Sequence, residues 1–486
     1  AVAVTTTAGT NGATVTAGAI DIDGGTTVSV TQSVASGVTY GSTVNQSAVE
    51  VDGSALTTSV TINQANNAAG NAAQTAANGV VSVSGVTAAP GVTGVTAVTG
   101  ISYVASTKVA APAVTQGVVT IADKNGSSQT AAGTISTVTL NGWANGSGIT
   151  SNALTTLNLS GTTAASSGLT ITDNLTAHAT SRTTLALNTT SLASNATGTA
   201  SAGTITDANS TIGTVNLANS GLTNFGLSAA KVAALNISGT GSVTLPVNNT
   251  DLDALTSLAV IGAVSFNDGS LSSTGTLTNG LGSFGSSLAI SNNSAGNFTA
   301  SINATKQAYA GGLGNDTIVI SADATKAIVG GAGTDELVLG ATGSTFTAAY
   351  TGQNVSGFET LGLVDVGGTT TVDAAQFVGQ TFSTINVRSA GYTATVNNAA
   401  QNAAINFQNT TTAGVVENYI DKSGATDNVT ETIGSATNSA NKTVYGLTVQ
   451  DANGVGIGTL NIVSNNTLQA YDGHTTDGLN TSTTWT

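Results

Sequence analysis

Short runs in which apolar and polar residues alternate recur along the whole chain. In the first part of the sequence, the clearest of these runs lie at 27–31, 59–62 and 80–83. A period of two places successive side chains on opposite faces of a strand. Clusters of Gly and Asn separate the runs, and the Asp-Gly pairs at 23–24 and 52–53 favour tight hairpin turns. The pattern predicts an all-β protein that begins with a β-sandwich-like domain of antiparallel strands over residues 1–127.

From about residue 128 a different signal dominates, a short strand built around alternating Leu, Ile or Val. Its copies lie at 136–141, 155–161, 183–188, 213–217, 233–239, 256–260, 286–290, 359–363, 383–387 and 458–462. Successive central copies are some 19 to 30 residues apart, which is a solenoid period. A leucine-rich repeat fits less well, because the spacing is irregular and the connecting segments lack helical periodicity. We therefore predict a right-handed parallel β-solenoid over 128–310 that continues through 346–486, with a short helix near 373–380.

Two glycine-rich loops interrupt this series, and they define a third section at 311–345. The segments GGLGNDTIV (311–319) and GGAGTDELV (330–338) begin 19 residues apart, close to the roughly 18 residues of two nonapeptides. Glycines allow left-handed backbone that turns carbonyls toward one point, and the aspartate adds an anionic oxygen. Calcium takes about 6–8 oxygen ligands, which two stacked loops can supply and one cannot. The loops predict a Ca²⁺-binding β-roll, and the alternative is that they are ordinary Gly-Asn-Asp turns.

The acidic runs at 20–23 and 49–52 are a weaker candidate for a second calcium site. In each of them carboxylates alternate with apolar residues before an Asp-Gly pair. Hairpin turns are the favoured interpretation of these residues. A second calcium site is the weaker alternative.

Composition narrows the function classes. Charged residues make up only 7% of the chain, and the net charge is −15 with nine Lys and Arg. Nucleic-acid binding needs clustered cations and is therefore not expected. The chain has no cysteine, so disulfides and thiol metal sites are excluded. No apolar run reaches the length of a membrane-spanning helix, so we expect no membrane insertion. Because methionine is absent even at position 1, we expect an interior or processed portion of a longer product.

The loop pair, the segment VSGFETL at 355–361 and the repeated TLNLSG-type strands resemble the RTX-type surface-layer proteins of Gram-negative bacteria, which carry haemolysin-type calcium-binding repeats. The resemblance implies a protein that leaves the cell by type I secretion, folds in extracellular calcium and assembles with itself into a two-dimensional S-layer lattice. It also implies attachment to a cell-surface glycan or lipopolysaccharide through a region outside this chain, and an assembly or secretion tail within 346–486. The calcium ligands that it implies are Gly312, Gly314, Asn315, Asp316, Gly331, Gly333, Thr334 and Asp335.

Two alternatives accompany this prediction. An RTX adhesin that binds surfaces or neighbouring cells would have a similar composition. A β-helical polysaccharide lyase or epimerase would need clustered Arg, Lys and carboxylates, whereas the nine cations here are scattered along the sequence. His178 and His474 are far apart in sequence, and we expect each to be a solvent-facing polar residue. We therefore expect no enzymatic activity.

Overall fold

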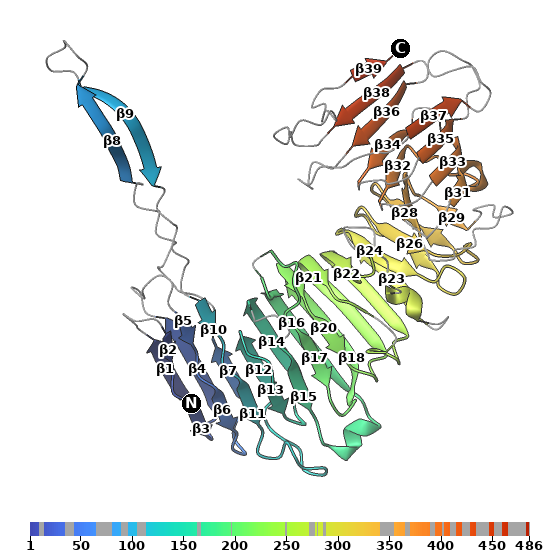
Figure 1. The fold of residues 1–486 in the computed structure, drawn as a ribbon. Helices are drawn as coiled ribbons and strands as arrows, with labels where there is room; N and C mark the ends of the chain where they lie inside the picture. Colours follow the sequence, from blue (N-terminus) through green and yellow to red (C-terminus); the bar gives the residue numbers. More distant parts are fainter. Residues whose placement is uncertain are drawn as a thin grey trace.

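The computed structural model shows an elongated stack of β-coils (Figure 1). It describes residues 1–8, 14–34, 43–64, 80–88, 96–104, 113–162, 167–195, 197–247, 250–271, 278, 280–284, 288–340, 354–364, 370–388, 394–400, 403–408, 415–419, 428–433, 447–451, 459–464 and 483–485.

One long parallel sheet extends along the stack. Its strands, in chain order, are β1 (Val2–Ala8), β4 (Thr27–Val34), β7 (Ser59–Asn63), β12 (Thr137–Asn141), β14 (Thr156–Thr162), β16 (Thr183–Ala193), β18 (Ile212–Ser220), β19 (Leu222–Asn224), β21 (Ala234–Thr244), β22 (Ser257–Asn267), β23 (Ala289–Ser294), β24 (Phe298–Ile302), β26 (Thr317–Ile320), β28 (Glu336–Leu339), β30 (Thr360–Leu363), β32 (Thr384–Val387), β34 (Ala404–Phe407), β36 (Asn428–Ile433) and β38 (Thr459–Ser464). The last of these pairs antiparallel with β39 (Thr483–Trp485).

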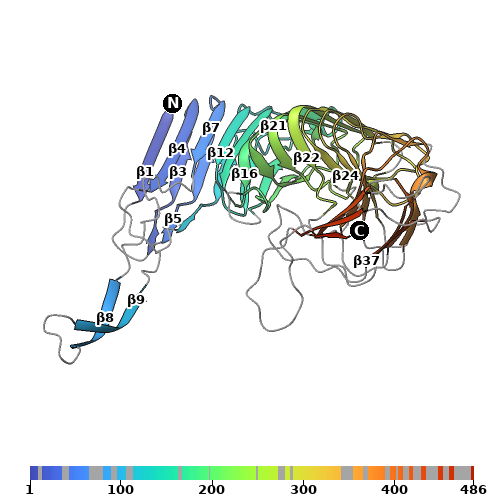
Figure 2. The same ribbon diagram turned by 90° about the horizontal axis from the view of Figure 1, so that it is seen from above.

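Shorter parallel sheets form the other sides of the coils. The largest contains β3 (Ile20–Asp23), β6 (Val49–Asp52), β11 (Val119–Ala122), β13 (Ser147–Thr150), β15 (Leu169–Thr172), β17 (Thr204–Asp207) and β20 (Gly226–Ser228). Three smaller sheets contain β2 (Thr14–Thr16), β5 (Thr43–Asn45) and β10 (Ala113–Thr115); β25 (Tyr309–Ala310), β27 (Ile328–Val329) and β29 (Val355–Ser356); and β31 (Thr370–Asp373), β33 (Ala394–Ala399), β35 (Val415–Tyr419) and β37 (Leu447–Asp451). Figure 2 shows the stack of coils from above.

The parallel β-solenoid that the strand series predicts is confirmed. Val138 pairs with Leu157, and Leu235 pairs with Leu258, so the leucine positions stack as the repeat indicates. At one step the register differs from the sequence alignment, because Leu157 pairs with Leu187 and not with Leu185. A shift of two residues keeps the same side chains pointing inward.

The N-terminal region is a correction to the predicted sandwich-like domain of antiparallel strands. β1, β4, β7 and β12 pair in parallel, so the solenoid already includes the first residues and continues past residue 127 without a change of architecture. The Asp-Gly pairs do not close hairpins, since β3 and β6 lie side by side and parallel. An alternating pattern reports which face is buried and says nothing about strand direction, which is why the hairpin interpretation failed here.

An antiparallel ribbon interrupts the third coil. β8 (Val80–Ala88) and β9 (Thr96–Val104) pair only with each other among the described strands. The ribbon projects away from the stack beside β5 and β10 (Figure 1), and it also projects away from the stack when seen from above (Figure 2). The residues at 65–79, which the sequence leaves as a loop or a helical turn, lie outside the described residues.

A continuous aliphatic core fills the coils. Val30, Ile62, Leu140 and Leu159 are at most 1% exposed, and the cluster extends without a break to Phe407. The helical elements among the described residues are single 3-10 turns: η1 (Thr176–Ala179), η2 (Gly280–Ser283) and η3 (Ala374–Gln376), the last within the segment predicted as a short helix. Within the described residues, no helix has the length and apolar character needed to cross a membrane.

Candidate metal centre

The two glycine-rich loops stack directly on one another. β26 and β28, which follow the loops, pair in parallel with Ile318 opposite Leu337, so one 19-residue coil separates the two copies. The approach of the loop backbones excludes side chains. A Cβ atom on Gly311 would lie 1.5 Å from the Gly330 carbonyl oxygen, and one on Gly314 would lie 2.3 Å from the Gly296 carbonyl oxygen. These glycines are therefore required by the stacking itself, whether or not a metal binds.

The outer residues of the loops bind the neighbouring coil. Asn315 and Thr334 are exposed, and Asn315 Oδ1 accepts a hydrogen bond of 2.9 Å from the Thr334 N–H. Gly331 and Gly333 are also exposed, and both have positive φ, +108° and +133°. The Asn315 side-chain oxygen thus already has a protein donor, while the left-handed glycines have the conformation that the nonapeptide requires.

Asp316 and Asp335 point inward and belong to one column of acidic side chains. Both are 0% exposed. The Asp316 N–H donates to Asp335 Oδ1 at 2.7 Å, and the Asp335 N–H donates to Glu359 Oε2 at 2.8 Å. Likewise the Phe298 N–H donates to Asp316 Oδ1 at 2.9 Å. Each carboxylate therefore caps the backbone of the preceding coil.

Asp316 is supplied with donors on both oxygens. Its Oδ2 accepts hydrogen bonds from Tyr309 Oη at 2.7 Å, Asn292 Nδ2 at 3.1 Å and the Gly312 N–H at 3.2 Å. Burial still raises the pKa of Asp316, against the lowering effect of these hydrogen bonds. Burial is also the main cause that raises the pKa of Tyr309, followed by the negative charge of Asp316. Four hydrogen-bond donors already surround the Asp316 carboxylate, so Asp316 would be a poor ligand for a cation in this arrangement.

Asp335 is different because one of its oxygens has no partner. Its Oδ2 is buried and accepts no hydrogen bond. Burial, and then the neighbouring charges of Asp316 and Glu359, raise the pKa of Asp335 to about 6, against the lowering effect of the Asp316 N–H. A buried carboxylate oxygen without a donor is costly unless a proton or a cation satisfies it. Asp335 Oδ2, with Glu359 as the adjacent carboxylate, is therefore the point in the column where a proton or a cation fits.

Sequence reasoning missed Glu359, Tyr309 and Asn292. The sequence did contain a signal for Glu359. Glu359 directly precedes β30 as Asp335 directly precedes β28, and the two strands pair in the register that places these residues at equivalent positions. Tyr309 and Asn292 had no such signal in the sequence. Both bind Asp316, which lies one strand after Tyr309 along the coil and 24 residues after Asn292 in the sequence. The assignment of all eight loop residues as calcium ligands stays a prediction.

The acidic runs near the N-terminus do converge. Their strands β3 and β6 are neighbours, and the carboxylate oxygens of Asp21, Asp23 and Asp52 lie within 4.8 Å of one another. All three side chains are exposed. Water can solvate such carboxylates without an ion, so the cluster remains a weaker candidate than Asp335.

Among the described residues, His178 and Arg388 each contact a carboxylate elsewhere on the solenoid. His178 Nδ1 is 2.6 Å from Asp173 Oδ2, and the histidine side chain is 24% exposed. Arg388 Nε donates to Glu336 Oε1 at 2.7 Å, and the same guanidinium also binds Glu336 Oε2. His474 lies outside the described residues.

No family model matches the chain, and a search of curated proteins finds no match. The class that the structure defines is therefore architectural: an all-β protein built as a parallel β-solenoid, with a stacked pair of glycine-rich loops and an acidic column beneath them.

Proposed function

We propose that this protein is a structural component of the bacterial cell surface that assembles with copies of itself into a calcium-stabilised S-layer lattice. The observation that carries the calcium part is the acidic column of Asp316, Asp335 and Glu359, in which Asp335 Oδ2 is buried without a partner. A divalent cation at Asp335 would offset most of the negative charge of this column and join successive coils.

The chain's own residues define what calcium would do. Asp335 and Glu359 come from adjacent coils, so a cation bound between them favours the stacked state over the separated one. Because the unfolded chain has no such site, binding stabilises the fold in proportion to the logarithm of calcium concentration above the Kd. Calcium then acts as a structural clamp on the solenoid and has no role in chemistry.

Assembly and secretion rest on the resemblance and on the character of the molecule. An elongated stack of coils that is rich in hydroxyl side chains and has only 7% charged residues suits a lattice building block. The adhesin alternative shares these properties. The β-helical enzyme alternative has no specific support among the described side chains.

Electron microscopy of the purified full-length chain, with calcium and with chelator, tests the proposal. Ordered two-dimensional sheets that form only with calcium are expected. Monodisperse particles under both conditions would contradict the lattice and favour the adhesin. An Asp316→Ala/Asp335→Ala variant should lose calcium-dependent stabilisation of residues 311–339, whereas Asp253→Ala, at an exposed position, should retain it.

A further inference from the structure

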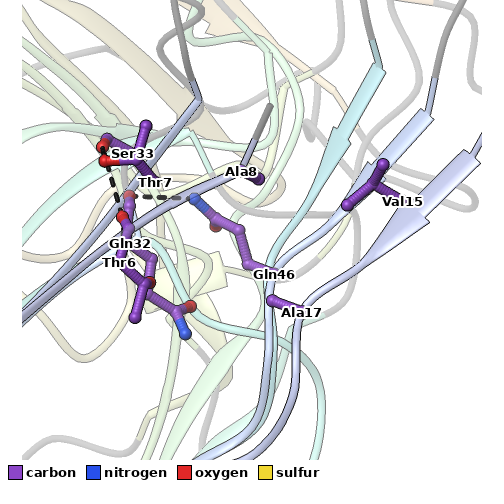
Figure 3. Close-up of a pocket in the computed structure, with 8 residues that line it drawn as sticks. All are labelled: Thr6, Thr7, Ala8, Val15, Ala17, Gln32, Ser33 and Gln46. Carbon is purple, nitrogen blue, oxygen red and sulfur yellow. Dashed lines mark hydrogen bonds between the residues drawn. The ribbon is translucent and has the colours of Figure 1, made fainter. Parts of the chain in front are cut away.

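A polar pocket opens at the N-terminal end of the solenoid, far in sequence from the calcium loops. It lies between the first two coils, and its volume is about 220 Å³. β1 and β4 contribute Thr6 and Gln32, while Ala17 and Gln46 directly follow β2 and β5. Figure 3 shows the Gln46 side chain extending toward Gln32 and Thr6.

The pocket exists because a ladder of buried glutamines ends there. Gln32, in the second coil, lies opposite Thr6 of the first coil. The third coil has Gln64 at the corresponding position. Gln46 similarly follows β5 where Ala17 follows β2. The first coil thus carries smaller residues at both positions, and the space of two glutamine side chains is left over.

Two hydrogen-bond acceptors in this space have no partner. Gln32 and Gln46 are only 3% and 7% exposed, and the Oε1 atom of each is buried without a hydrogen bond. The orientation of the Gln46 amide is determined chemically, because its Nε2 donates to the Gln32 backbone carbonyl at 3.2 Å and a carbonyl can only accept. Gln46 Oε1 must therefore point away from that bond. A buried acceptor is costly to the fold if nothing donates a hydrogen bond to it.

Gln64 shows what a fully bonded member of the ladder looks like. Its Nε2 donates to the Ser47 carbonyl at 3.0 Å, and its Oε1 accepts from the Gly117 N–H at 3.0 Å. Gln32 and Gln46 each have only the donor half of this arrangement, since Gln32 Nε2 donates to Ser47 Oγ. What Gln32 Oε1 and Gln46 Oε1 lack is a hydrogen-bond donor each, which a molecule in the pocket would supply.

The lining determines the chemistry of a ligand. The free groups are acceptors, so the ligand must donate hydrogen bonds. None of the eight lining residues is charged, so an ion would lose its hydration without a counter-charge. Ala8, Val15 and Ala17 form an apolar wall. The volume is well above the roughly 10–15 Å³ that one water needs and below the roughly 300 Å³ at which drug-sized sites begin.

We propose that this pocket binds one ring of a neutral saccharide. A sugar ring combines hydroxyl donors for Gln32 Oε1 and Gln46 Oε1 with a C–H face for the apolar wall. The hydroxyl of Thr6 adds a group that can donate or accept. This site is independent of the proposed lattice, since it requires only the first two coils of a folded chain.

Ligand-observed NMR and calorimetry on the full chain, in calcium, test the proposal. The probes are the methyl glycosides of glucose, galactose and mannose. Binding of at least one glycoside is expected, and Gln46→Met should weaken it at least tenfold. Gln64→Met, at a buried glutamine outside the pocket, should leave the affinity within twofold.

A second variant guards against misfolding of the first. Ala17→Leu keeps both glutamines and fills the pocket, so it should also abolish binding. Failure of all three glycosides to bind the parent chain would overturn the proposal and indicate that water alone satisfies the glutamines. Binding that survives both Gln46→Met and Ala17→Leu would overturn it as well, by locating the ligand elsewhere. Neither outcome depends on whether lattices form.

Discussion

Replacement of Asp335 by Asn should stabilise the calcium-free protein. The pKa of Asp335 is raised from its ordinary 3.8 to about 6 in the folded chain, mainly by burial. Each pKa unit corresponds to about 1.4 kcal/mol. The ionised side chain therefore lowers the local free energy of unfolding by about 3 kcal/mol above pH 6. Asn removes this penalty, and its Oδ1 can still accept the Asp316 N–H.

The sign of the pH dependence follows from the raised pKa. As pH increases from about 4 to about 6, the unfolded chain loses the Asp335 proton before the folded chain does, and the folded state loses stability across that window. Hydrogen exchange of residues 311–339 in chelator, corrected for intrinsic rates, measures the effect. At pH 7.5 we expect Asp335→Asn to exchange about a hundredfold more slowly than the parent, and at pH 4 at the same rate.

Calcium should reverse the order of stability of the parent protein and Asp335→Asn. With calcium the parent gains stability and the variant, without its anionic ligand, gains little. An exposed control, Asp253→Asn, should follow the parent in every condition. If the parent in chelator exchanges equally at pH 4 and pH 7.5, the buried column is not ionised as the structure indicates, and the reasoning fails.

Two further substitutions test the stacking of the coils. Gly311→Ala places a Cβ 1.5 Å from the Gly330 carbonyl oxygen, so it should separate the two loops and accelerate hydrogen exchange in both. The control Gly18→Ala has no atom within 4 Å of its Cβ and should behave as the parent, so equal exchange in the two variants would contradict the close approach. Arg388→Ala leaves Glu336 buried and unpaired, and should cost about 3–5 kcal/mol in denaturant unfolding of this section. The double variant Glu336→Leu/Arg388→Leu should recover most of this loss, and an equally large loss in it would show that packing, and not charge, holds the pair.

The strand series was predictable because a solenoid repeats its inward residues. Val138, Leu157 and Leu235 are buried at the positions that the alternation indicates. The 19-residue interval between the loops likewise predicts their stacking, and Ile318 does lie opposite Leu337. In both cases the information is local, since a coil contacts only its neighbours.

Strand direction and polar partners were harder to predict. The alternation in β4 is the same for a parallel or an antiparallel neighbour, so the hairpin interpretation of the first 127 residues had nothing in the pattern to correct it. Gln32 did leave a signal, because it continues the inward series of Val28 and Val30. A glutamine at an inward position requires a buried partner, and the sequence does not show whether protein or ligand provides it. Asp316 shows the same limit, since its donors come from three separate segments of the chain.

The ribbon β8–β9 shows how much free energy the fold loses when extra residues are inserted into one coil. Asn63 pairs with Asn141, 78 positions away, in the same register that joins Val28 to Val60 across 32 positions. The entropy of closing a loop grows only with the logarithm of its length, so the longer excursion adds roughly 1 kcal/mol to the cost of that one coil. Nearest-neighbour contacts confine this cost to a single step of the stack. A solenoid of this kind can therefore acquire a projecting element of almost any length at one corner while the neighbouring coils keep their register.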